Sequence, residues 1–115
     1  MSVQDDPDDP LMPGRPDGRR DPRRELAAEA VIKNARQLRI GGSLVDISEH
    51  GCRIEIHVGT AERDQIVTIR LGNMDSWAGV VRWSNGSQVG IEFMTPLHSA
   101  VVDHLSQTYA AVEIV

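Results

Sequence analysis

Four arginines in the segment GRRDPRRE are the first side chains of this 115-residue chain that suggest a chemistry. Arg19 and Arg23 lie four residues apart, and so do Arg20 and Arg24, which gives two overlapping RxxxR pairs. A guanidinium group binds phosphate through parallel charge-assisted hydrogen bonds, and its flat face stacks on aromatic rings. The cluster therefore suits a compact anionic ligand with aromatic parts, although taken alone it is also explained as a solvated run of charge.

A second group of polar side chains forms the motif DxSxxG, which consists of Asp46, Ser48 and Gly51. Asp and Ser side chains hydrogen-bond nearby backbone groups and glycine permits tight turns, so the motif alone indicates a turn between two strands. Asp46, Ser48 and His50 also alternate, so on one extended strand their side chains would share a face and could be mistaken for a hydrolase triad. Ser48 is not part of a GxSxG nucleophile elbow, so this trio does not predict catalysis.

Other common reactive sites lack their motifs. His50, Cys52 and His57 do not form an HExxH or paired CxxC pattern, so we expect no metal. Neither GxGxxG nor GxxxxGK[ST] occurs, so no nucleotide cofactor of the common kinds is expected. The chain is therefore expected to be a binding protein and not an enzyme.

The net charge and the lengths of the apolar runs limit the kinds of partner that the chain can bind. The net charge of −5 argues against DNA or RNA, because their binding needs a clustered excess of Lys and Arg. No apolar run approaches the roughly 20 residues that span a bilayer, and the N-terminus is acidic. We therefore expect no membrane insertion and a cytoplasmic location.

The chain divides near its arginine cluster. Five of the six prolines precede residue 23, and the acidic segment before the cluster has few apolar side chains to bury. Residues 1–18 are expected to be a disordered tail, and residues 19–115 a single domain.

Runs of alternating apolar residues predict six short strands. They lie at about residues 26–32, 38–47, 52–58, 67–71, 77–83 and 89–93. Gly41-Gly42 predicts an interruption, and Asn85-Gly86 predicts a hairpin turn. Trp77 and Trp83 alternate with apolar neighbours and are expected in the core, not on a base-stacking surface. Such a series favours a small closed barrel or a sandwich.

The C-terminal segment predicts one helix. Thr95 is a suitable N-cap, and Pro96 suits the first helical position. Apolar residues then recur every four positions, at Leu97, Val101, Leu105 and Tyr109.

Together, the RxxxR pairs, the DxSxxG motif and the strands that contain VVRW and VGIEF resemble the PilZ domain family over about residues 19–110. The resemblance implies a six-stranded antiparallel β-barrel with a C-terminal helix, which binds the bacterial second messenger cyclic di-GMP. In that family the paired arginines grip the phosphates and stack on guanine. The Asp and Ser of DxSxxG hydrogen-bond the ligand, and its Gly leaves room for it. These roles would fall on Asp46, Ser48, Gly51 and one of the arginine pairs.

The spacing leaves the choice of pair open, because Arg19 with Arg23 and Arg20 with Arg24 both give RxxxR. The strand period after residue 23 favours Arg19 with Arg23. Since no enzymatic or output domain is apparent, any signal would pass to an effector protein, which the sequence does not identify. The alternative is an adaptor that has this fold and binds protein partners without a ligand.

Overall fold

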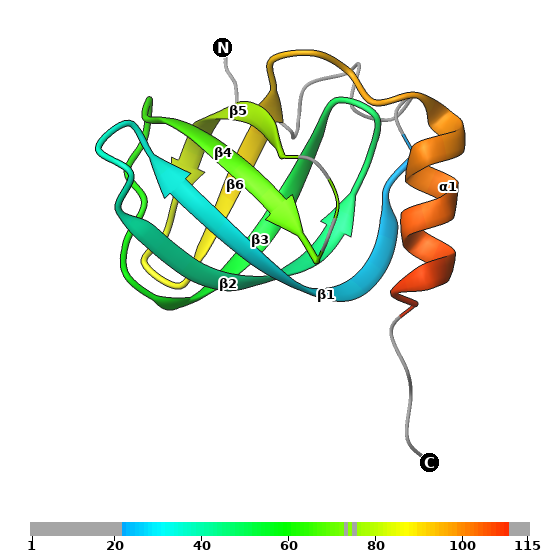
Figure 1. The fold of residues 1–115 in the computed structure, drawn as a ribbon, viewed down its shortest axis with the longest axis horizontal. Coiled ribbons are helices and arrows are strands. Elements are labelled where there is room, and N and C mark those ends of the chain that lie inside the picture. The colour runs from blue at the N-terminus through cyan, green and yellow to red at the C-terminus, as the bar shows by residue number, and fades with distance from the viewer. Residues whose placement is uncertain (1–21, 73, 75, 111–115) are drawn as a thin grey trace, which may run out of the picture.

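Six antiparallel strands close into a barrel among the residues that the computed structural model describes, which are 22–72, 74 and 76–110 (Figure 1). The elements are β1 (Arg24–Asn34), β2 (Arg39–Ile47), β3 (Gly51–Val58), β4 (Ile66–Leu71), β5 (Trp77–Ser84), β6 (Gln88–Phe93) and α1 (Ser99–Thr108). The strand order is β1-β2-β3-β6-β5-β4, and β4 pairs back onto β1. The barrel and its C-terminal helix confirm the expected fold. The proposed tail, residues 1–18, lies outside the described residues.

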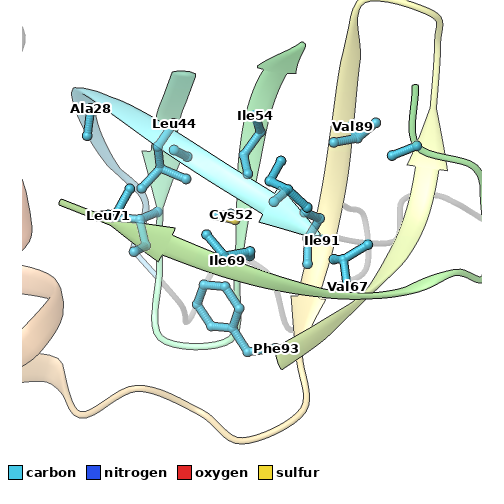
Figure 2. Close-up of a cluster of buried hydrophobic side chains, with 14 of the residues drawn as sticks. Ala28, Leu44, Cys52, Ile54, Val67, Ile69, Leu71, Val89, Ile91 and Phe93 are labelled. Atoms are coloured by element: carbon cyan, nitrogen blue, oxygen red, sulfur yellow. The ribbon is translucent and has the colours of Figure 1, made fainter. Parts of the chain in front are cut away.

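Alternate side chains of every strand fill the interior of the barrel (Figure 2). Leu44, Ile54, Ile69 and Ile91 come from four different strands, and each is 0% exposed. Full burial of one such side chain stabilises the folded state by about 1.5–3 kcal/mol. The period of two read from the sequence is therefore the pattern that forms the core.

The glycine pair lies inside one continuous strand, where the pairing with β3 is irregular. β2 continues through Gly41 and Gly42, and the β2–β3 register shifts between them. The expected interruption is thus wrong. Gly42 lies so close to β3 that an added Cβ would come within 2.4 Å of the backbone oxygen of Glu55.

The helix begins later than the sequence predicted. Its N-cap is His98 and not Thr95, and His98 Nδ1 accepts a hydrogen bond of 2.9 Å from the backbone N–H of Ala100. The preceding segment stays outside the helix because the Leu97 N–H donates to the Glu49 carbonyl at 2.8 Å. This bond fastens the connection between β6 and α1 to the turn that joins β2 and β3.

The two tryptophans have different surroundings. Trp77 packs against the core, and its ring meets Phe93 edge to face with centroids 5.9 Å apart. Trp83 is only half-buried and does not belong to the core cluster. It covers Gly90, where an added Cβ would lie 2.1 Å from the indole nitrogen. The core expectation is therefore right for Trp77 and wrong for Trp83, because glycine provides space for the indole on the outer wall.

Cys52 gives a test of how tightly the barrel is closed. Its thiol is fully buried, and burial, followed by the nearby charge of Asp46, raises its pKa far above the ordinary value of 9.0, while Arg23 lowers it in part. The unfolded chain therefore releases this proton first as pH rises. We expect the free energy of unfolding to fall by up to about 1.4 kcal/mol per pH unit above pH ~9.

Denaturant titrations from pH 7 to pH 10.5 would measure this effect, with Cys52→Ala as the comparison. The variant should be less stable at neutral pH but should lose less stability as pH rises, because it lacks the titrating thiol. Equal alkaline losses in the two proteins would show that Cys52 does not stay protonated in the folded barrel.

Candidate functional site

Asp46 owes its position to an irregularity in β2. Leu44 pairs with Ile54 and Asp46 pairs with Arg53, so Val45 is an extra residue in the strand. Leu44 and Ile54 point into the barrel, and one extra residue reverses the alternation after them. Asp46 therefore lies with Arg53 on the outer wall instead of following Leu44 inward.

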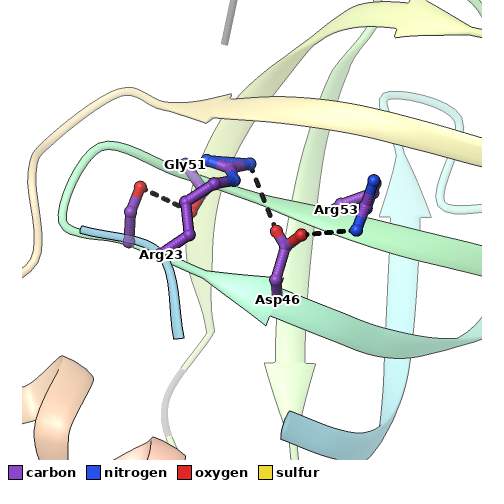
Figure 3. A network of polar contacts seen from close by, with 5 residues as sticks. Arg23, Asp46, Gly51 and Arg53 are labelled. Carbon is purple, nitrogen blue, oxygen red and sulfur yellow. Dashed lines mark hydrogen bonds and ion pairs between the residues drawn. The ribbon is translucent and has the colours of Figure 1, made fainter. Parts of the chain in front are cut away.

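Two arginines cover the Asp46 carboxylate (Figure 3). Arg23 Nη2 lies 3.2 Å from Asp46 Oδ1, and Arg53 Nη2 lies 2.8 Å from Asp46 Oδ2. The Asp46 side chain is only 6% exposed, whereas those of Arg23 and Arg53 are 35% and 43% exposed. The result is a nearly buried carboxylate beneath two guanidinium groups that are partly exposed to solvent.

The two carboxylate oxygens of Asp46 differ in how well they are satisfied. Oδ1 is buried and accepts no hydrogen bond, although Arg23 lies within ion-pair distance. A buried acceptor without a hydrogen bond costs about 1–3 kcal/mol. Such an atom favours any ligand that brings an N–H donor to it.

Ser48 and Gly51 close the turn between β2 and β3. The Gly51 carbonyl accepts hydrogen bonds from the backbone N–H of Ser48 at 2.8 Å and from its hydroxyl at 3.2 Å. Ser48 is 0% exposed, and the neighbouring His50 carbonyl accepts a bond of 2.8 Å from the Phe93 N–H. Backbone hydrogen bonds from β6 and from the segment before α1 thus fasten this turn to the rest of the domain.

The adjacent arginines Arg23 and Arg24 point to different partners. Arg23 lies against Asp46, whereas Arg24 Nη2 is 2.8 Å from the Asp103 carboxylate of α1. Successive side chains of an extended segment point to opposite sides, which explains the divergence. The structure thus brings Arg23 together with Asp46, and it does not bring Arg24 there; Arg19 and Arg20 lie outside the described residues.

Comparison with known families identifies the domain to which these residues belong. The family model described as PilZ domain matches residues 17–111, which is most of the chain. The chain belongs to the PilZ domain family. PilZ domains are binding domains known for cyclic di-GMP and are not enzymes. No curated protein matches the chain.

The pairing of Arg53 with Asp46 is a contact that the sequence did not predict. One row of register partners crosses β2, β3, β6 and β5 on the outer wall. It consists of Asp46, Arg53, Gly90 and Trp83. The sequence places Arg53 on the wet face of its strand, which is a useful signal. Its contact with Asp46, however, depends on the extra residue Val45, which the sequence pattern does not reveal.

The remaining reactive side chains of this PilZ domain are separated. Cys52 is in the core, and His57 Nε2 lies 2.8 Å from the Ser43 hydroxyl on the outer wall. Within residues 22–72, 74 and 76–110, no three His, Cys, Asp or Glu side chains are grouped to hold a metal ion. Nor does this part of the chain contain a helix long and apolar enough to cross a membrane.

Proposed function

We propose that this PilZ domain binds cyclic di-GMP on the outer wall of the barrel and relays the signal to a protein partner in the bacterial cytoplasm. In this proposal Arg19 and Arg23 hold the phosphates and stack on guanine. Asp46 accepts hydrogen bonds from the ligand, Ser48 assists it, and Gly51 leaves room. Arg20 and Arg24 are the alternative arginine pair.

The observation that carries the proposal is the unsatisfied Oδ1 of Asp46 next to Arg23. Guanine has N–H donors on its Watson–Crick edge. The phosphate groups of the same ligand are negatively charged and can accept charge-assisted hydrogen bonds from Arg23. One ligand that combines these groups would donate a hydrogen bond to the buried oxygen, and its phosphate would bind Arg23 in place of Asp46. The position of Arg24 against Asp103 favours Arg19 with Arg23 over the alternative pair.

Calorimetric titration of the full chain with cyclic di-GMP tests the proposal, with cyclic di-AMP as the ligand control. We expect a saturable isotherm for cyclic di-GMP and much weaker heats for the adenine analogue, because adenine presents a different donor pattern to Asp46. No heat with a correctly folded chain would contradict ligand binding and would support the ligand-independent adaptor.

A further inference from the structure

We propose that Arg53 is a positioning residue of the ligand site, which holds the Asp46 carboxylate in place while Arg23 moves from Asp46 to the ligand. This inference rests on the proposed function for its binding step. Its structural premise, that two arginines share one buried carboxylate, concerns the ligand-free protein alone.

The two arginines are attached to the barrel in different ways. Arg53 lies within β3, in the last pair but one of the β2–β3 ladder, as the direct register partner of Asp46, and its Nη2–Oδ2 contact is 2.8 Å. Arg23 precedes β1, and its contact with Oδ1 is longer, at 3.2 Å, and is not a hydrogen bond. Arg53 is therefore the fixed partner, and Arg23 is the exchangeable one.

Because Asp46 is buried, it needs one arginine that stays when the other leaves. A buried carboxylate that loses all its cationic partners is strongly destabilised, because desolvation is no longer compensated. When Arg23 turns to a phosphate, Arg53 still neutralises Asp46, so the exchange does not leave an isolated buried charge. Without Arg53, the Asp46 charge would retain Arg23 and oppose ligand binding.

A stability cycle without ligand tests the shared carboxylate. Arg23→Ala and Arg53→Ala each leave Asp46 with one cation, so each should lower the urea midpoint only slightly. The double variant leaves no cation from this pair and should lower the midpoint by clearly more than the sum of the two shifts. Additive shifts would overturn the premise, whether or not the chain binds cyclic di-GMP.

Binding titrations test the positioning role. Arg53→Ala should weaken cyclic di-GMP binding about tenfold, and Arg53→Lys should recover part of the loss because it restores a positive charge near Asp46. Arg82→Ala is the matched control, since Arg82 is also an outer-wall arginine but pairs with Glu92 at 2.6 Å. It should leave the dissociation constant unchanged.

The Asp46→Asn background separates positioning from direct contact with the ligand. A neutral amide no longer needs a cation, so Arg53→Ala should have little further effect on binding in that background. An undiminished effect there would mean that Arg53 touches the ligand itself and would overturn the inference. An unchanged affinity in the single variant Arg53→Ala would overturn it as well. If wild-type chain gave no binding, the proposed function would fail, while the stability cycle would still decide whether the carboxylate is shared.

Discussion

Replacing Arg23 by alanine is expected to weaken cyclic di-GMP binding by about tenfold to a hundredfold or more, while the domain stays folded. Hydrogen bonds to charged groups contribute on the order of 1.5–3 kcal/mol, which corresponds to that range of affinity. The fold should survive because Arg23 precedes β1 and because Arg53 still neutralises Asp46. Calorimetry measures the affinity, and urea denaturation measures the stability.

Arg24→Ala is the internal control for this experiment. Arg24 is the next residue along the chain, but it pairs with Asp103 of α1, and both side chains are about half exposed. Exposed ion pairs contribute only about 0–1 kcal/mol to stability, so this variant should bind and fold almost as the wild type does. The same contrast is expected between Arg19→Ala and Arg20→Ala. If Arg24→Ala abolished binding while Arg23→Ala did not, Arg20 with Arg24 would be the functional pair.

Gly42→Ala is expected to destabilise the barrel by about 1–3 kcal/mol or more, the usual cost of forcing extra atoms into a well-packed site. The added Cβ would lie 2.4 Å from the Glu55 backbone oxygen and 2.8 Å from Ile54 Cγ2. Backbone cannot rotate away as a side chain does, so β2 and β3 would have to separate locally. The urea midpoint should fall markedly.

The neighbouring glycine provides the comparison. A Cβ at Gly41 would meet the Val58 side chain, with Cβ at 3.7 Å and Cγ2 at 4.0 Å, which is ordinary van der Waals contact. Gly41→Ala should therefore leave the midpoint nearly unchanged. Similar losses in both variants would mean that the glycines act through backbone conformation and not through the close approach of β2 to β3.

The sequence predicted the elements better than their irregularities. The six strands follow from apolar alternation, since burial of one face is a property that each strand carries locally. The alternation left a barrel or a sandwich open, and the resemblance to PilZ domains implied the barrel. The side on which Asp46 lies does not follow in this way, because Val45 becomes an extra residue only when β2 pairs with β3. The resemblance to PilZ domains implied that Asp46 is a site residue, but the sequence gave no indication that Arg53 is its partner.

Helix α1 illustrates a second limit. Thr95 and Pro96 have the chemistry of a helix start, but the bond from the Leu97 N–H to the Glu49 carbonyl accompanies a chain that does not enter the helix until after His98. A contact between segments almost fifty residues apart thus overrides a local capping preference. Such contacts become predictable only when the arrangement of the barrel is known.

The most direct test of the account is a ¹H–¹⁵N NMR titration of the full chain with cyclic di-GMP. We predict that the amide signals of Arg23 and of residues 46–51 shift or exchange as ligand is added. The signals at the other end of β2 should not change; there Asn34, Leu38 and Ile66 line a groove that serves as an internal reference. A spectrum that does not change, or changes confined to that groove, would contradict the proposal that this PilZ domain binds cyclic di-GMP beside Asp46.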